Sequence, residues 1–245
     1  MKFLRRYLYK KMGLERYLRF VSKWYIWLVD KGFFKKKHPE IHYLPEVIHQ
    51  GDTCIDIGAN LGYYTIFMSK LTGPRGKVYA AEPVPMFIKI WKDNVKKTGY
   101  DNMEMLPYAL GETEQTVKMG MPAPEGIVHH GMTKVIDNEN KNFSENFEAE
   151  MKVPDKLFAD IQHIDFIKID IEGYEYPVLK NMIKTLRKHR PKLQIELSKD
   201  REAIFELLET EGYLPHILIK GIIIPAGNDA KKQHNRDFYF FPKTR

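Results

Sequence analysis

From residue 53 onward, short apolar runs alternate with segments whose apolar residues recur at helical spacing. The runs that predict buried strands lie at 53–55, 77–81, 103–106, 164–171 and 192–197, and two or three further strands are expected within 213–224 and 237–241. The segments that predict helices begin near residue 66 and cover 87–97, 176–187 and 202–209. Strands that alternate with helices are typical of a mainly parallel sheet with helices on both faces. We therefore predict an α/β fold built on a mainly parallel, seven-stranded sheet.

Residues 1–40 are expected to form a basic, amphipathic helical extension that precedes a main domain at 41–245. Between Leu14 and Leu28 the apolar residues recur at helical spacing, with basic residues beside them. The uninterrupted apolar part is far shorter than the ~20 residues that a membrane-spanning helix needs. Amphipathicity leaves two alternatives open: the helix packs on the domain or on a second subunit of a homodimer, or residues 1–37 contact an anionic membrane surface.

The alternation of strands and helices is interrupted at about 112–153, which is rich in Gly, Pro, Asn and Glu. Polar and apolar residues alternate at 115–119, as in a half-exposed strand. We predict an inserted hairpin with a long loop, and long loops in compact domains are often lids or binding loops. This loop carries two adjacent histidines, His129 and His130.

The charge of the chain is concentrated at its N-terminus. Residues 1–37 carry twelve Lys and Arg against two acidic residues, a net charge of +10, whereas the remaining residues carry 27 basic and 30 acidic side chains, a net of −3. A mildly acidic main domain makes a nucleic-acid substrate unlikely, because nucleic-acid enzymes more often have basic residues around the active site. The only cysteine, Cys54, lies in an apolar strand, so no disulfide can form within the chain. The first residues are too charged for the apolar core of a signal peptide. We expect a cytoplasmic protein, peripheral at a membrane if residues 1–37 bind one.

A glycine-containing turn follows the first predicted strand. Gly58 and Gly62 flank Asn60, whereas a dinucleotide-binding turn carries three glycines in the order Gly-x-Gly-x-x-Gly. Asp56 ends the strand, and an acidic residue there repels a pyrophosphate but suits a cationic ligand. Glu82 ends the next strand, where a carboxylate can accept hydrogen bonds from both hydroxyls of a ribose. Together these residues point to S-adenosylmethionine (SAM), which carries an ammonium and a sulfonium and no phosphate.

The predicted strand at 164–171 carries charges where a central parallel strand is normally apolar. Lys168 and Asp170 are two residues apart and share one face of the strand. Asp170 should lie at the carboxyl edge of the sheet, where open α/β sheets bind ligands, although a purely structural ion pair with Lys168 is the alternative. Glu196 ends the next strand, so Asp170 and Glu196 are candidate ligands of a divalent cation, or could instead bind sugar hydroxyls or water.

Three motifs together resemble the FkbM-type methyltransferase family. They are Asp56-Ile57-Gly58-Ala59-Asn60-Leu61-Gly62-Tyr63-Tyr64-Thr65, Ala81-Glu82-Pro83 and Phe166-Ile167-Lys168-Ile169-Asp170-Ile171-Glu172-Gly173-Tyr174-Glu175. The resemblance covers about residues 50–200 and implies a class I, Rossmann-like methyltransferase fold with SAM as cofactor. It implies that the cofactor lies against Asp56, Gly58, Asn60, Gly62 and Tyr64, with its ribose at Glu82 and its adenine near Ala109 and Leu110. It also implies that Asp170 and Glu172 mark the edge of the active site.

The family usually methylates hydroxyl oxygens, and a sugar hydroxyl needs a base or a metal to react at neutral pH. Asp170, beside Lys168, is the first candidate for the base, and His129 and His130 are the next. We therefore predict a SAM-dependent O-methyltransferase whose acceptor is a sugar or glycan hydroxyl, with another small metabolite as an alternative acceptor. A catalytically weak SAM-binding scaffold, with the N-terminal helix as its interaction device, is the alternative from a different class.

Overall fold

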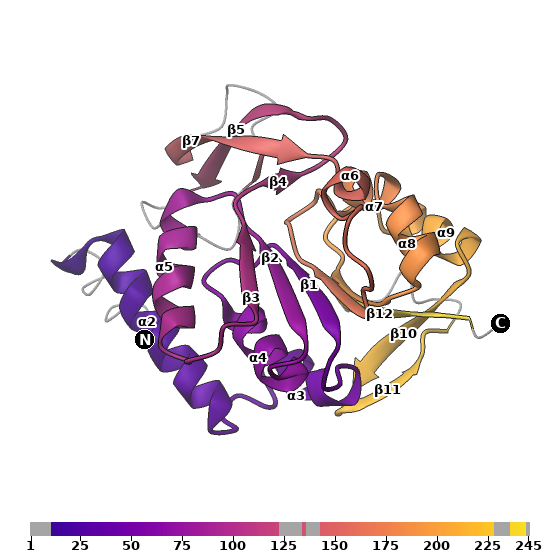
Figure 1. Cartoon of the computed structure of the whole chain (residues 1–245), viewed down its shortest axis with the longest axis horizontal. Coiled ribbons are helices and arrows are strands. Elements are labelled where there is room, and N and C mark those ends of the chain that lie inside the picture. Colours follow the sequence, from indigo (N-terminus) through magenta and orange to yellow (C-terminus); the bar gives the residue numbers. More distant parts are fainter. Residues whose placement is uncertain (1–10, 123–133, 136–142, 228–235, 244–245) are drawn as a thin grey trace.

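The computed structural model describes residues 11–122, 134–135, 143–227 and 236–243, and it has the predicted α/β architecture (Figure 1). The main sheet has eight strands in the order β11-β10-β12-β9-β8-β1-β2-β3. The five strands from β9 to β3 run parallel. The strands of this sheet are β1 (Thr53–Ile57), β2 (Lys77–Ala81), β3 (Met103–Leu106), β8 (Phe166–Ile169), β9 (Lys192–Glu196), β10 (Tyr213–Ile219), β11 (Ile222–Pro225) and β12 (Asp237–Pro242).

The predicted count of seven strands is wrong by one, because β11 adds an edge strand to the sheet. A two-residue turn joins β10 to β11, and its residues Lys220 and Gly221 both have positive φ angles, 51° and 82°. Positive φ at both positions is the backbone of the tight hairpin turn that matches the twist of paired strands. The chain therefore folds back on β10 after Ile219, and Ile222 pairs with it.

Helices cover both faces of the main sheet. They are α2 (Leu14–Asp30), α3 (Pro39–Tyr43), the 3₁₀ helix η1 (Leu44–Glu46), α4 (Tyr63–Thr72), α5 (Pro85–Lys96), α6 (Pro154–Leu157), α7 (Glu175–Lys180), α8 (Ile183–His189) and α9 (Arg201–Thr210). On one face, Ile55 and Ile57 of β1 pack in the cluster that includes residues of α7, α8 and α9. On the other face, Cys54 packs in the cluster that contains Met68 of α4. Successive residues of β1 thus face opposite layers, as the pleat of a strand requires.

The single helix predicted at 176–187 is two helices, α7 and α8. Asn181 ends α7 with φ −97° and ψ 14°, and its side-chain amide donates to the carbonyl of Pro177. The carboxylate of Asp155 then accepts hydrogen bonds from the backbone N–H groups of Lys184 and Thr185 in the first turn of α8. Asp155, which is distant in sequence, therefore caps the start of α8. The spacing of apolar residues along 176–187 could not reveal this second helix start.

The inserted hairpin is present as part of a second sheet of four strands, in the order β4-β7-β5-β6. Its strands are β4 (Ala109–Leu110), β5 (Gln115–Pro122), β6 (Lys134–Val135) and β7 (Phe143–Lys152). β5 and β7 pair antiparallel over most of their lengths. Because β4 follows β3 directly, this small sheet lies at the carboxyl end of β3, and Figure 1 shows it above the main sheet.

The N-terminal helix α2 packs on the main domain, against α5 (Figure 1). Leu18 is buried in a cluster with Leu61, Val84 and Phe87. Ser22, also buried, accepts a hydrogen bond of 3.0 Å from the side-chain amide of Asn94. Among the described residues, no helix combines the length and the apolar character needed to cross a membrane.

Candidate functional site

The turn after β1 requires glycine at position 58. Gly58 has a φ of +83°, and a Cβ atom at this position would lie 2.0 Å from the carbonyl oxygen of Asp170. The backbone N–H groups of Gly58 and Ala59 both donate to the carbonyl of Ala81, which ties the turn to the end of β2. Only glycine allows the end of β1 and the end of β8 to approach this closely. The turn is thus a backbone cradle at the carboxyl edge of the sheet.

Glu82 organises the rest of the turn. Its Oε2 accepts a 2.8 Å hydrogen bond from the backbone N–H of Asn60, and its Oε1 accepts one of 2.9 Å from Val84. Asn60 itself has a left-handed backbone, with φ 50°. Burial raises the pKa of Glu82 to about 7, although the two backbone N–H groups act to lower it. The carboxylate therefore shapes the loop and also stands at the position expected to hold a ribose.

Asp56 is completely buried beneath the turn. Its Oδ2 accepts a 2.6 Å hydrogen bond from the hydroxyl of Thr65, and the indole N–H of Trp91 donates to the same hydroxyl at 3.1 Å. Burial raises the pKa of Asp56, while the Lys168 ammonium and the Thr65 hydroxyl act to lower it. The other oxygen, Oδ1, has no hydrogen-bond partner among the described residues.

Lys168 lies between Asp56 and Asp170, the two aspartates predicted from the sequence to belong to the site. Its ammonium nitrogen lies 3.2 Å from Oδ2 of Asp170 and 3.8 Å from Oδ1 of Asp56. It also lies 4.4 Å from the centre of the Tyr64 ring, in a cation–π contact. Burial acts to lower the pKa of Lys168, but Asp170 and Asp56 raise it above its ordinary value. The ion pair therefore keeps a positive charge in the buried layer behind Asp170.

A polar row crosses the sheet at this level. Asp56 of β1 pairs in register with Lys168 of β8, which pairs with Gln194 of β9, which pairs with Tyr239 of β12. Residues in register on neighbouring strands point to the same face, so these side chains form one buried layer. Gln194 donates to the hydroxyl of Tyr64 at 3.3 Å, which links the row to α4. Burial raises the pKa of Tyr64 well above its ordinary value, so this tyrosine stays a neutral phenol.

Beyond this row, acidic side chains gather at the carboxyl edge. Asp170 follows β8 with a side chain 32% exposed, and Glu196 of β9 pairs in register with Asp237 of β12. Burial, with Asp170 nearby, raises the pKa of Glu196 to about 7. Burial, followed by Glu40 and Asp170, also raises the pKa of Asp237 to about 7. Arg236 offsets part of this negative charge, with a guanidinium nitrogen 2.9 Å from Glu196.

The structure does not support the expected divalent cation. Asp170 and Glu196 do end neighbouring strands, but Asp170 is paired with Lys168 and Glu196 with Arg236. In the described ranges, no group of three or more His, Cys, Asp or Glu side chains has the arrangement of a metal site.

The other predicted residues are placed as follows. Gly62 immediately precedes α4, with a φ of +91°, and a Cβ atom at this position would lie 3.0 Å from Cδ1 of Trp91. Ala109 and Leu110 form β4 and are largely buried in the apolar clusters on either side of it. Their expected contact with adenine stays a prediction. The histidines proposed as alternative bases, His129 and His130, lie outside the described residues.

Sequence reasoning missed several members of the site. Thr65 and Trp91 hold Asp56, Gln194 joins the polar row, and Asp237 joins the acidic edge. Gln194 was detectable in principle, because a polar residue in an apolar central strand needs a partner. Asp237 was not, since its place opposite Glu196 depends on the last strand inserting beside β9.

The part of the chain that carries the glycine turn, Lys168 and Asp170 matches a known family. Residues 56–217 match the family model described as the methyltransferase FkbM domain. This range begins at Asp56, includes both aspartates that contact Lys168, and ends within β10.

Three similar proteins illustrate the extent of the likeness. A protein-L-isoaspartate O-methyltransferase of Methanococcoides burtonii is 34% identical over 59 residues, which cover 24% of this chain and 29% of that protein. The methyltransferase FkbM of Methylobacillus flagellatus KT has a similar fold, with a TM-score of 0.52 and 17% identity, over 82% of this chain and 50% of that one. A SAM-dependent methyltransferase of Aquifex aeolicus gives a TM-score of 0.42 and 16% identity over 81% of this chain and 86% of that one. This chain therefore spans less than a third of the isoaspartate enzyme and half of the FkbM structure.

Proposed function

Because the chain belongs to the FkbM methyltransferase family, whose members are SAM-dependent methyltransferases, we propose that it methylates a hydroxyl oxygen of a sugar or glycan. The observation that carries this proposal is the position of Asp170. Its carboxylate stands at the carboxyl edge of the sheet, beside the glycine turn, with one oxygen held by Lys168 and the side chain partly exposed. A carboxylate held this way can accept the proton of a hydroxyl group.

The residues of the turn fit SAM. Two buried acceptor atoms have no hydrogen-bond partner among the described residues: Oδ1 of Asn60, and Oδ1 of Asp56, which has only the longer ion pair of 3.8 Å with Lys168. Buried acceptors without a donor are costly, and the ammonium and hydroxyl groups of SAM are donors. Gly58 leaves no room for a side chain and brings the backbone of the turn close to the carbonyl of Asp170. Asp56, Asn60 and Glu82 would hold the cofactor, which when bound supplies an electrophilic methyl group on a positively charged sulfur.

The protein residues then have separable roles. Asp170 accepts the proton of the acceptor hydroxyl, which makes the oxygen a better nucleophile. Lys168 fixes one oxygen of Asp170 at 3.2 Å, and Tyr64 packs against the Lys168 ammonium. Lys168 thus fixes the position of the Asp170 carboxylate, and this carboxylate in turn aligns the acceptor hydroxyl. Alignment of reacting groups is a large part of catalysis.

The acidic edge favours a polyhydroxyl acceptor. Asp170, Glu196 and Asp237 lie at one edge of the sheet, and their carboxyl groups can form hydrogen bonds with the hydroxyls of a sugar. The curated relatives are named for isoaspartate, an acceptor with a negatively charged carboxylate. Glu196 and Asp237, whose pKa values are both about 7, disfavour an anionic acceptor when they are ionised, so we favour a neutral hydroxyl over a carboxylate.

The proposal is tested by a transfer assay with methyl-labelled SAM. Acceptors would be neutral saccharides, the same saccharides with one hydroxyl removed at each position in turn, and an isoaspartyl peptide. We expect label in a neutral saccharide, and its loss when one particular hydroxyl is missing. Labelling of the isoaspartyl peptide with no labelling of any saccharide would overturn the proposal.

A further inference from the structure

The outward face of α2 carries a stripe of large aromatic side chains. Phe20, Trp24 and Trp27 follow one another at spacings of four and three residues, so they share one face of the helix. They are 45%, 52% and 50% exposed. Their rings contact edge to face, with centroids 6.3 Å and 5.7 Å apart. A contiguous group of exposed aromatic rings is unusual on a soluble surface and marks an interaction site.

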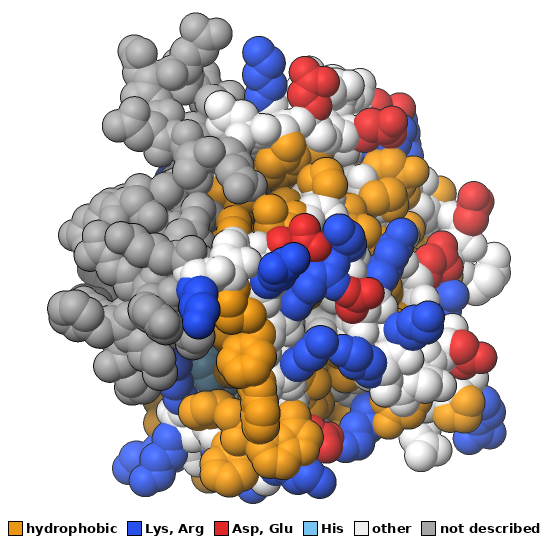
Figure 2. Space-filling view, turned by 90° about the vertical axis from the view of Figure 1, so that its left-hand side faces the viewer, with side chains coloured by type: hydrophobic (Ala, Val, Ile, Leu, Met, Phe, Trp, Pro, Cys, Tyr) orange, Lys and Arg blue, Asp and Glu red, His pale blue; other side chains and the backbone are white. Residues whose placement is uncertain are grey.

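Basic side chains surround this aromatic stripe. Arg16 lies four residues before Phe20, and Lys31 lies four residues after Trp27, so both continue the same face and both are exposed. Three further exposed lysines, 35–37, follow the helix, and the ammonium of Lys37 lies 5.9 Å from the centre of the Phe34 ring. Figure 2 shows hydrophobic side chains gathered on this side of the molecule with Lys and Arg side chains around them.

The packing of the helix keeps the stripe turned outward. The opposite face of α2 is fixed by buried Leu18 and by the hydrogen bond between Ser22 and Asn94 of α5. Arg19 forms an ion pair with Asp93, and Glu15 forms one of 3.0 Å with Lys89. The aromatic face is therefore a fixed feature of the folded domain.

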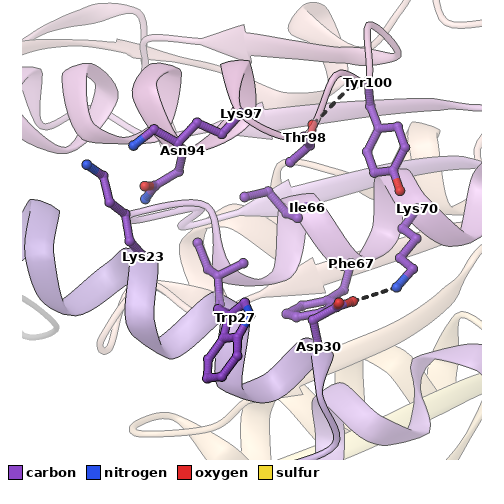
Figure 3. A pocket seen from close by; sticks show the side chains of 11 residues that line it. Lys23, Trp27, Asp30, Ile66, Phe67, Lys70, Asn94, Lys97, Thr98 and Tyr100 are labelled. Carbon is purple, nitrogen blue, oxygen red and sulfur yellow. Dashed lines mark hydrogen bonds and ion pairs between the residues drawn. The ribbon is translucent and has the colours of Figure 1, made fainter.

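A cavity of about 390 Å³ opens beside the stripe, between α2, α4 and α5 (Figure 3). Trp27 and Phe67 form part of its apolar wall, and Lys23 and Lys97 stand together at one end. The neighbouring Lys23 ammonium lowers the pKa of Lys97. Two ammonium groups this close repel each other, and an anionic group placed between them would relieve the repulsion.

We propose that this face docks on an anionic phospholipid bilayer, with Phe20, Trp24 and Trp27 in the headgroup region and the Lys23–Lys97 pair on a lipid phosphate. Tryptophan rings favour the boundary between water and hydrocarbon, and lysines near the surface are attracted to anionic headgroups. A second copy of the chain fits the face less well, because a symmetric contact would bring these cations against one another. The proposal is independent of the identity of the methyl acceptor.

The test is co-sedimentation of the full chain with vesicles of phosphatidylcholine, with and without phosphatidylglycerol. Two double variants probe the face: Phe20→Ala with Trp24→Ala, and Lys23→Glu with Lys31→Glu. The matched control is Lys180→Glu with Lys184→Glu, which makes the same charge change at exposed lysines of α7 and α8. Tryptophan fluorescence gives a second readout, because Trp24 and Trp27 are exposed whereas the third tryptophan, Trp91, is buried.

We expect binding to vesicles that contain phosphatidylglycerol, with a blue shift of the tryptophan emission and weaker binding at high salt. Each variant of the face should lower the partition coefficient roughly tenfold or more, while the control keeps it. Absence of vesicle binding, or an equal loss in the control, would overturn the proposal. A dimer without vesicles that the Phe20→Ala, Trp24→Ala variant converts to a monomer would overturn it too, in favour of a subunit interface.

Discussion

At residue 58, one backbone contact decides which amino acid can occupy the turn. A methyl group on Gly58 would meet the carbonyl oxygen of Asp170 at 2.0 Å, and the φ of +83° already disfavours other residues. The contact joins the cofactor turn to the strand that carries the proposed base. Position 58 therefore couples the two halves of the site.

We predict that Gly58→Ala destabilises the fold by about 3 kcal/mol or more and abolishes SAM binding, because backbone must move apart to admit the methyl group. Gly51→Ala is the matched control, since Gly51 has a φ of +91° but nothing within 4 Å of the added carbon. It should cost only the ~1–2 kcal/mol of a left-handed alanine. Chemical denaturation measures both, and equal losses would show that the contact with Asp170 is unimportant.

The raised pKa of Asp237, about 7, gives the stability of the protein a definite dependence on pH. Between about pH 4, where an unfolded aspartate ionises, and about pH 7, the folded state binds more protons than the unfolded state. The free energy of unfolding should therefore fall as the pH rises through this window, by up to about 1.4 kcal/mol per pH unit for this group.

In the Asp237→Asn variant the free energy of unfolding should fall less steeply with pH. The variant should be more stable than the wild type at pH 8, because the wild type must then bury the ionised carboxylate of Asp237 and the variant has no such charge. Asp160→Asn, at an exposed aspartate, is the control and should leave the pH profile unchanged. Urea titrations from pH 4 to pH 8 give the profiles. A wild-type stability that increases over this range would contradict the assignment.

Single residues of the site could be predicted where a polar side chain interrupts an apolar pattern. Asp56, Lys168 and Asp170 were recognisable in this way, and the structure brings all three together. Asp237 was not recognisable, because its neighbours come from other strands and only the sheet order makes it part of the acidic edge.

At the scale of elements, α2 belongs to the folded domain on one face and is exposed on the other. Leu18, which is 1% exposed, packs with residues from the cofactor turn and from α5, whereas Trp24 on the opposite face is half exposed. The helix that its sequence marks as a separate extension therefore contributes to the core.

We predict that Leu18→Ala lowers the free energy of unfolding by about 2–4 kcal/mol, because it leaves a cavity under α2. Trp24→Ala should change it by less than about 0.5 kcal/mol, since the side chain is exposed. Thermal and chemical denaturation distinguish the two. A Leu18→Ala protein as stable as the wild type would mean that α2 is not held in this position.

Regular elements followed from the sequence where the determinants are local. β2 and β3 lie where their apolar runs predicted them. The break between α7 and α8 was missed, because Asp155 supplies the helix cap from a distant segment. The apolar pattern left open whether one or two strands lie within 213–224, and the count of seven omitted β11, because this strand depends on a tight turn at an otherwise ordinary Lys-Gly pair.

At the scale of the whole molecule, the sheet order gathers the chemistry at one edge. β1, β8, β9 and β12 are neighbours, so Asp56, Asp170, Glu196 and Asp237 meet although more than 180 residues of sequence can separate them. The alternation of strands and helices predicted a parallel sheet, but periodicity contains no information on which strands are adjacent. The order of the strands was therefore not predicted, and it comes from the structure.

The central claim is that Asp170 is the base for methyl transfer to a hydroxyl, and it is tested most directly in Asp170→Asn. The measurement is turnover with a saccharide acceptor, alongside SAM affinity by calorimetry, with Asp160→Asn as control. We predict that kcat falls by about 10²–10⁴-fold while the Kd for SAM changes less than about threefold, because the change removes a proton acceptor and keeps the shape of the side chain. Turnover close to that of the wild type would contradict the account.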